Sequence, residues 1–102
     1  MFGLFGKKPD FMTLLQEAKG NKDAVVIDVR EPDEYVQGHV PGSINIPTSQ
    51  INTVNHAKDT PLYLYCLSGG RSKMAMGFLE QKGFQNVKNM GAIGQYQGEL
   101  EK

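Results

Sequence analysis

The sequence contains a single cysteine, no tryptophan and no excess of charge of either sign. One cysteine cannot form an intrachain disulfide, a CxxC redox pair or a cysteine-rich zinc site. The 11 Lys and Arg residues balance 11 Asp and Glu residues, so the chain lacks the long-range field that draws proteins to nucleic acid. The two histidines, His39 and His56, lie far apart in sequence. We therefore expect neither a metal site nor a nucleic-acid partner.

Long apolar stretches are also missing. No run approaches the roughly 18 apolar residues that indicate a membrane-spanning helix, so no transmembrane segment is expected. The N-terminus places Phe2, Leu4 and Phe5 ahead of two lysines, whereas a secretory signal carries its charges before a longer apolar stretch. We therefore expect a cytoplasmic protein with a reduced thiol. Residues 1–9 are expected to form a tail that frays or packs on the domain, and contact with a membrane surface is the alternative.

The chain has 102 residues, of which 39% are hydrophobic, and 12 glycines. This is an ordinary globular composition. Because a compact domain usually has about 100–150 residues, the length suits one domain. Residues 1–102 are therefore predicted to form a single folded unit.

Helix and strand patterns alternate along the chain. The expected helices span residues 10–20, 32–37, 48–56, 71–82 and 92–100, and the expected strands span residues 24–27, 44–46, 62–65 and 84–87. Asp10 is a good N-cap for the first helix, and Pro32 suits the first turn of the second. In helix 71–82 the expected buried stripe comprises Met74, Ala75, Phe78 and Leu79. Strands that alternate with helices predict an α/β fold with a parallel sheet covered on both faces.

The strongest chemical signal lies where strand 62–65 ends, a position at which such sheets bind ligands. Residues 65–73 read Tyr-Cys-Leu-Ser-Gly-Gly-Arg-Ser-Lys. Glycines allow successive backbone N–H groups to turn inward and form an anion-binding nest. The start of the next helix adds partial positive charge and Arg71 adds a full one, so the surroundings of Cys66 favour a thiolate.

These features make Cys66 the candidate nucleophile. The candidate anion-binding loop that follows it comprises Leu67, Ser68, Gly69, Gly70 and Arg71. The alternative is that Cys66 is a small buried hydrophobic residue at the end of a strand, without a chemical role.

Three segments of the sequence resemble a single-domain rhodanese, a thiosulfate:sulfur transferase. They read CLSGGRS at residues 66–72, VVIDVREPDEYVQGHVPGSINIP at 25–47 and GFQNVKNMGAI at 83–93, and the likeness extends over about residues 24–96. The resemblance implies an α/β fold with a central, mainly parallel sheet of about four to five strands and helices on both faces. It implies no metal and no organic cofactor.

The resemblance also implies a reaction. The Cys66 thiolate takes a sulfane sulfur from a small anionic donor such as thiosulfate and becomes a persulfide. A thiophilic acceptor then removes that sulfur. The acceptor is cyanide in an assay, and a thiol or a partner protein in the cell.

Asp28 and Arg30 follow a neighbouring strand, and by the same resemblance they belong to a hydrogen-bonded framework near the site. We expect Glu34 to form an ion pair with Arg30. Arg71 either contacts the anionic donor or braces the loop, and the sequence leaves both roles open. His39 precedes Val-Pro-Gly and is expected to have a conformational role rather than that of a general base.

Three other functions fit the sequence less well or equally well. A cysteine phosphatase or arsenate reductase of this fold needs five residues between Cys and Arg, and here four residues separate Cys66 from Arg71. A non-catalytic docking or regulatory module typically lacks the cysteine, which this chain retains. A persulfide carrier that serves a dedicated partner has the same sequence features as a stand-alone enzyme.

Overall fold

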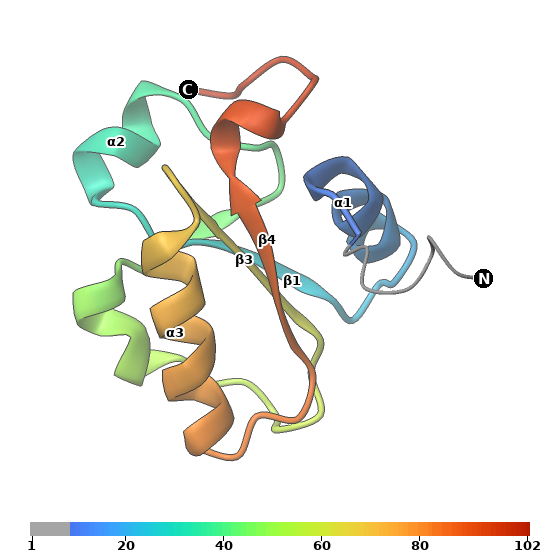
Figure 1. Cartoon of the computed structure of the whole chain (residues 1–102), viewed down its shortest axis with the longest axis vertical. Helices are drawn as coiled ribbons and strands as arrows, with labels where there is room; N and C mark the ends of the chain where they lie inside the picture. The colour runs from blue at the N-terminus through green and yellow to red at the C-terminus, as the bar shows by residue number, and fades with distance from the viewer. Residues whose placement is uncertain (1–8) are drawn as a thin grey trace.

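The computed structural model describes residues 9–102, so the predicted tail, apart from Pro9, lies outside the described residues. The elements in chain order are α1 (Phe11–Lys19), β1 (Val25–Asp28), α2 (Pro32–Gln37), β2 (Ile44–Asn45), the 3-10 helix η1 (Thr48–Thr53), β3 (Leu62–Cys66), α3 (Gly70–Gln81), β4 (Val87–Ala92) and the 3-10 helix η2 (Ile93–Gln95) (Figure 1). In the part of the chain described here, no helix has the length and apolar character needed to cross a membrane.

The four strands form one sheet in the order β2-β1-β3-β4, and every neighbouring pair is parallel. Val25 lies opposite Leu62, and Asp28 lies opposite Tyr65. Because the strands run in one direction, the carboxyl ends of β1 and β3 lie at the same edge of the sheet. Asp28 at the end of β1 therefore lies beside Tyr65, the residue before Cys66. This confirms the predicted α/β fold and parallel sheet.

Helix α1 covers one face of the sheet. Asp10 caps it, since its Oδ1 accepts a hydrogen bond from the N–H of Thr13 at 2.9 Å. The buried residues on this face are Phe11, Leu14, Leu15, Ala18, Val40, Tyr63, Tyr65 and Met90. Phe11 meets Tyr65 edge to face with 5.7 Å between ring centroids, a favourable aromatic geometry that anchors α1 to β3.

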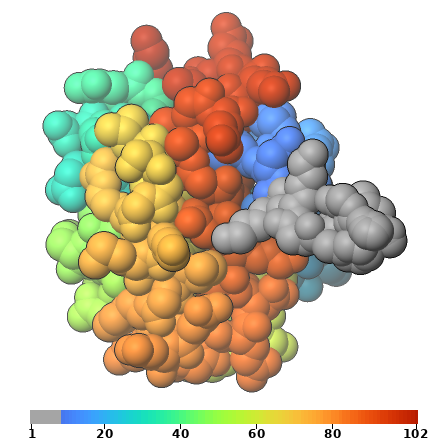
Figure 2. All heavy atoms as spheres, in the orientation of Figure 1, coloured from blue at the N-terminus to red at the C-terminus, as the bar shows by residue number. Residues whose placement is uncertain are grey.

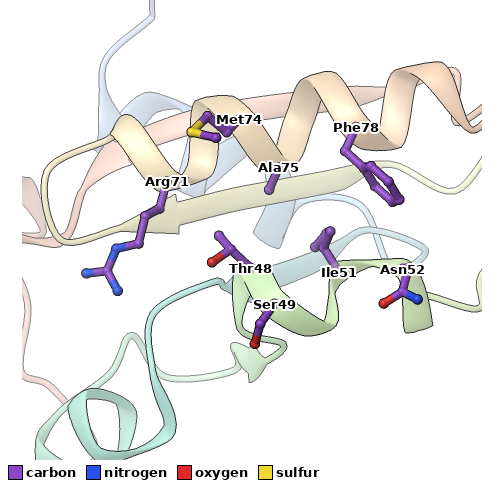
Figure 3. A pocket seen from close by; sticks show the side chains of 8 residues that line it. All are labelled: Thr48, Ser49, Ile51, Asn52, Arg71, Met74, Ala75 and Phe78. Atoms are coloured by element: carbon purple, nitrogen blue, oxygen red, sulfur yellow. The ribbon is translucent and has the colours of Figure 1, made fainter.

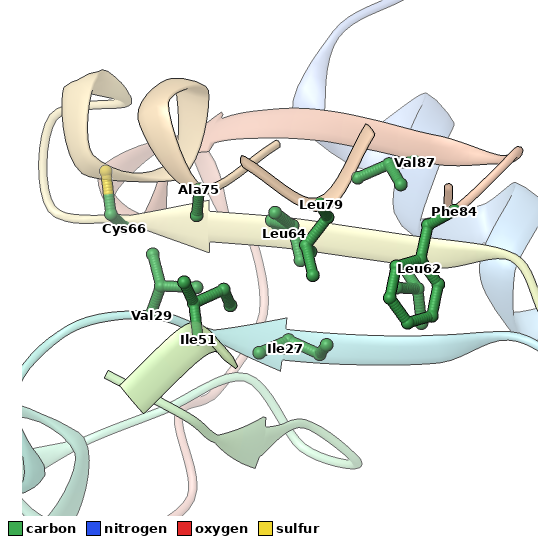
Figure 4. Close-up of a cluster of buried hydrophobic side chains, with 10 residues drawn as sticks. All are labelled: Ile27, Val29, Ile51, Leu62, Leu64, Cys66, Ala75, Leu79, Phe84 and Val87. Carbon is green, nitrogen blue, oxygen red and sulfur yellow. The ribbon is translucent and has the colours of Figure 1, made fainter. Parts of the chain in front are cut away.

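Helix α3 and η1 cover the opposite face (Figure 4). The buried residues there are Ile27, Val29, Ile51, Leu62, Leu64, Cys66, Ala75, Leu79, Phe84 and Val87. Alternate residues of β3 point to the two faces, as the pleat of a strand requires. Every residue of β3 is therefore buried, and the strand delivers Cys66 to the face that α3 covers.

Three expectations about secondary structure were wrong in detail. No helix spans 92–100: β4 extends to Ala92 and only the short η2 follows, in a segment where Gly94 and Gly98 disfavour a helix. The expected helix 48–56 is the 3-10 helix η1. The strand expected from residue 84 begins at Val87, and Phe84 reaches the core from the preceding turn.

The buried face of α3 also differs from the prediction. Met74 is 77% exposed and Phe78 is 36% exposed, whereas Ser72, Ala75 and Leu79 are buried. The residues that face the sheet are spaced i, i+3 and i+7, so the apolar side chains one position before Ala75 and Leu79 are rotated away from it. The polar residue Ser72 takes the place nearest the Cys66 loop.

Candidate active site

Cys66 is the last residue of β3, and its side chain is fully buried. Its Sγ accepts a hydrogen bond from the N–H of Gly69 at 2.8 Å and another from the N–H of Ser72 at 3.4 Å. The hydroxyl of Ser72 lies 3.4 Å from the same sulfur. The turn after β3 and the first turn of α3 therefore surround the sulfur with hydrogen-bond donors.

The turn depends on Gly69, which has φ +94° and immediately precedes α3. This left-handed conformation is natural for glycine and costly for other residues. The two loop residues before Gly69, Leu67 and Ser68, are exposed. In the space-filling view, the loop after β3 reaches the surface between α2 and the β4 side of the molecule (Figure 2).

Two opposing effects act on the pKa of the Cys66 thiol. Burial raises it, but hydrogen bonds from the Ser72 hydroxyl and from the N–H groups of Ser72, Gly69 and Ser68 lower it by more. The net effect is a lowered pKa, so a larger fraction of the sulfur is thiolate at neutral pH. The sequence predicts that Arg71 also stabilises the anion, whereas the groups that lower the pKa of Cys66 are these hydrogen-bond donors.

Arg71 is engaged in an ion pair. Its guanidinium donates to both carboxylate oxygens of Glu34, at 2.9 and 3.2 Å. The same carboxylate accepts from the N–H of Glu31 at the start of α2. The hydrogen bond from Arg71, followed by that from Glu31, lowers the pKa of Glu34. This fork joins α3 to α2, a geometry that supports the bracing role of Arg71.

The expected Arg30–Glu34 ion pair was wrong. Arg30 turns inward to Asp28: its Nη2 lies 2.7 Å from Oδ2, and its Nε lies 3.0 Å from both carboxylate oxygens. Nη2 also donates to the carbonyl oxygen of Gly38 at 2.7 Å. Both side chains of the pair are buried, so burial of Arg30 beside Asp28 leaves Glu34 to Arg71.

This buried pair forms a framework at the end of β1. The Nδ2 of Asn45 donates to the backbone carbonyls of Asp28 and Arg30, each at 2.9 Å. Asp28 is the register partner of Tyr65, the residue before Cys66. The pair therefore orders the sheet edge beside Cys66.

His39 is held by local structure. Its ring stacks on Tyr35 with 3.8 Å between centroids, and its Nδ1 lies 2.9 Å from the Tyr35 carbonyl oxygen. Its backbone pairs with Glu101. These contacts support the conformational role expected for His39. In residues 9–102, no three His, Cys, Asp or Glu side chains gather as a metal site would require.

A cavity of about 600 Å³ lies between η1 and α3 (Figure 3). Its lining residues are Thr48, Ser49, Ile51, Asn52, Arg71, Met74, Ala75 and Phe78. Arg71 belongs both to this cavity and to the turn after Cys66, so the cavity adjoins the loop. No pattern in the sequence predicted it, because its two walls come from segments about 20 residues apart that meet only in the fold.

Two residues around the sulfur were missed by the sequence analysis. Ser72 directly follows the predicted loop. A polar residue on the helix face that packs against the sheet is the feature of the sequence that could have indicated it. Asn89 lies in β4, and its Oδ1 is 2.6 Å from the Ser72 hydroxyl. Nothing in the local sequence distinguishes Asn89 from an ordinary polar residue in a strand.

These observations define a class of protein: a parallel α/β domain with one buried cysteine, whose sulfur accepts hydrogen bonds from the residues that follow a central strand. The chain belongs to the rhodanese-like domain family, which matches residues 12–97. The family resemblance noted in the sequence is thereby confirmed.

The thiosulfate sulfurtransferase PspE of Escherichia coli is 37% identical over 71 residues, covering 66% of this chain and 68% of that protein. The tRNA sulfurtransferase of Desulfurococcus amylolyticus is 36% identical over 80 residues, covering 78% of this chain and 16% of that protein. A solved structure of a rhodanese with anions from E. coli is 32% identical with a TM-score of 0.71, covering 78% of this chain and 98% of that one. The chain thus matches nearly all of one relative and only a small part of another.

Proposed function

We propose that this protein is a sulfurtransferase that carries a sulfane sulfur on Cys66 as a persulfide. The observation that carries the proposal is the set of hydrogen bonds around the buried Sγ, from the N–H groups of Gly69 and Ser72 and the nearby Ser72 hydroxyl. The names of the relatives, thiosulfate sulfurtransferase and tRNA sulfurtransferase, support sulfur transfer as the general activity.

The proposed reaction has two half-reactions. The Cys66 thiolate attacks the outer sulfur of thiosulfate, the sulfur–sulfur bond of the donor breaks, and sulfite leaves with the electron pair. An acceptor thiolate or cyanide then attacks the outer sulfur of the persulfide, and Cys66 leaves as a thiolate. Each step forms one bond to sulfur and breaks one, so no external oxidant or reductant is needed.

The loop supports both half-reactions because the same donors can face either sulfur anion. The N–H groups that hold the thiolate can also hold the anionic persulfide, with little reorganisation between the two states. Leu67, Ser68, Gly69, Gly70 and Arg71 form this anion-binding turn. In this scheme Asp28, Arg30 and Glu34 order its surroundings, and no metal or cofactor takes part.

A phosphatase reading is less well supported by the geometry. Such an enzyme needs an arginine free to bind a tetrahedral oxyanion beside the cysteine. Here both terminal nitrogens of the Arg71 guanidinium donate to Glu34. The loop is also one residue shorter than a phosphatase loop. We propose further that residues 1–102 act as one unit in the cytoplasm, where the single thiol is kept reduced.

The test is the intact mass of the reduced protein after it is mixed with thiosulfate and separated from excess. A gain of one sulfur atom is expected, absent from the Cys66→Ser variant and removed by cyanide. If no sulfur is gained, a small organic persulfide is tried as the donor. Failure with both donors, in a folded protein with a free thiol, would contradict the proposal and favour a docking module.

A second measurement separates an enzyme from a dedicated persulfide carrier. The sulfur-loaded protein is mixed with small thiols, and the loss of the added sulfur is followed by mass. Fast release to small thiols, not accelerated by any cellular fraction, is the result expected of a stand-alone enzyme. Slow release that a protein fraction accelerates would instead identify a carrier.

A further inference from the structure

Asn89 extends from β4 to the turn that holds Cys66. Its Oδ1 accepts a hydrogen bond from the N–H of Gly91 at 3.0 Å, and its Nδ2 donates to the carbonyl oxygen of Gly69 at 3.3 Å. An N–H group requires an acceptor and a carbonyl requires a donor. These two contacts therefore fix which end of the amide carries the oxygen.

The Ser72 hydroxyl has more acceptors than it can serve. Its Oγ lies 2.6 Å from Asn89 Oδ1, 3.1 Å from the carbonyl oxygen of Gly69 and 3.4 Å from Cys66 Sγ. A serine hydroxyl has one proton to donate. While that proton lies on the short contact to Asn89, the hydroxyl cannot donate it to the sulfur.

We propose that Asn89 is a positioning residue that competes with the Cys66 sulfur for the single hydroxyl proton of Ser72. When the sulfur is a neutral thiol, the hydroxyl donates to Asn89. When the sulfur is an anion, the hydroxyl turns to it, because a hydrogen bond to an ionised acceptor is stronger. This rotation of the hydroxyl leaves Ser72 Oγ and Asn89 Oδ1 2.6 Å apart without a proton between them. The repulsion between the two oxygens opposes the rotation.

Such competition limits how far Ser72 stabilises the anion, and this suits a sulfur that must attack and then be released. The nucleophilicity of a thiolate falls as its pKa falls, so an overstabilised anion would react slowly with a donor. The benefit of limited stabilisation for catalysis rests on the proposed sulfur transfer. The effect of Asn89 on the pKa of the Cys66 thiol does not depend on that proposal.

Two ion pairs lie around this edge of the sheet. Arg71 of α3 is held by Glu34 of α2, and Asp28 and Arg30 at the end of β1 hold each other. Glu31, the residue before α2, donates its backbone N–H to Glu34. The two polar groups in competition are uncharged, so neutral substitutions there leave this pattern of charges unchanged.

The test uses the rate at which iodoacetamide alkylates the protein as a function of pH. Cys66 is the only cysteine in the chain, so the midpoint reports its pKa directly. Asn89→Leu should lower the midpoint by about 0.5, the size expected for one modest hydrogen bond. Ser72→Ala should raise it. In a Ser72→Ala background, Asn89→Leu should cause no further change.

A rise in the midpoint on Asn89→Leu would show that Asn89 only braces the loop, and would overturn the inference. An equal shift with and without Ser72 would also overturn it, because the effect would not pass through the hydroxyl. Asn89→Ala serves as a second variant, and thermal unfolding checks that each variant is folded. Alkylation needs no sulfur donor, so its outcome is independent of whether the protein transfers sulfur.

A measurement on the unaltered side chain avoids any question of folding. The ¹³C shift of the Asn89 side-chain carbonyl should titrate with Cys66, because that oxygen loses its hydrogen bond from Ser72 when the sulfur ionises. Most of this shift should be absent from Ser72→Ala. A carbonyl chemical shift that does not change as Cys66 ionises would overturn the inference.

Discussion

Gly69 offers the sharpest test of how the loop works, because it combines a left-handed backbone with the shortest hydrogen bond to the sulfur. Its φ is +94°, and its N–H lies 2.8 Å from Cys66 Sγ. A Cβ at this position would lie 3.7 and 3.8 Å from two backbone atoms of Gly91, which is ordinary contact. The cost of Gly69→Ala therefore comes from the backbone conformation rather than from a clash.

A non-glycine residue pays about 1–2 kcal/mol in the left-handed region. The free energy of unfolding of Gly69→Ala should fall by about that amount if the turn is kept. If the turn relaxes instead, the N–H leaves the sulfur. A hydrogen bond to a charged group contributes about 1.5–3 kcal/mol, so loss of this contact would raise the thiol pKa by about one to two.

The matched control is the neighbouring glycine. Gly70 is the first residue of α3 and has no positive φ, and a Cβ there would meet only the Ser68 hydroxyl at 3.9 Å. Gly70→Ala should leave stability unchanged or raise it by less than about 1 kcal/mol. It should also leave the thiol pKa unchanged.

Urea unfolding measures the first quantity and the pH dependence of alkylation measures the second. The expected result is a loss of stability, a raised thiol pKa or both in Gly69→Ala alone. Equal behaviour of the two variants would refute the reasoning, because it would show that the left-handed turn at Gly69 neither carries strain for alanine nor positions the donor.

Three further outcomes are expected. Asp28→Ala should reduce the free energy of unfolding by about 3–5 kcal/mol in urea, because it strands the buried guanidinium of Arg30 without its partner; a loss below about 1 kcal/mol would contradict the framework role. Glu34→Ala and Arg71→Ala should slow sulfur transfer to a similar extent, with no further loss in the double variant, since both remove one brace; additive losses would indicate that Arg71 acts on the donor independently. The pH-dependent part of the stability difference between the wild type and Cys66→Ser should favour the wild type in full above pH 9.0, the ordinary thiol pKa, and should be lost as the pH falls through the lowered folded value; a difference that does not vary with pH would show that folding leaves the thiol pKa unchanged.

Most of the sheet was predictable because its strands carry strong local signals. The apolar run of residues 24–27 and that of residues 62–65 both read as strands buried on two faces, and both are central strands in the structure. The capped helix that begins after Asp10 was equally clear. The segment after β4 was misjudged because helix propensity is weak there: it contains Gly94 and Gly98, and only the short η2 forms.

The site shows the same division between local and distant information. The position of Cys66 at the end of a strand and the glycines after it are features of one short segment, so the sequence indicates the candidate nucleophile and its turn. The side chains that contact this turn come from elsewhere in the sequence: Glu34 lies 37 residues before Arg71, and Asn89 lies 17 residues after Ser72.

A β-bulge in β4 places one of these side chains. Leu64 pairs with Asn89, whereas Tyr65 pairs with Gly91. That one-residue irregularity brings the Gly91 N–H onto Asn89 Oδ1 and thereby orients the amide toward the loop. A bulge depends on how two strands pair, so the surroundings of Cys66 include contacts that its own segment does not encode.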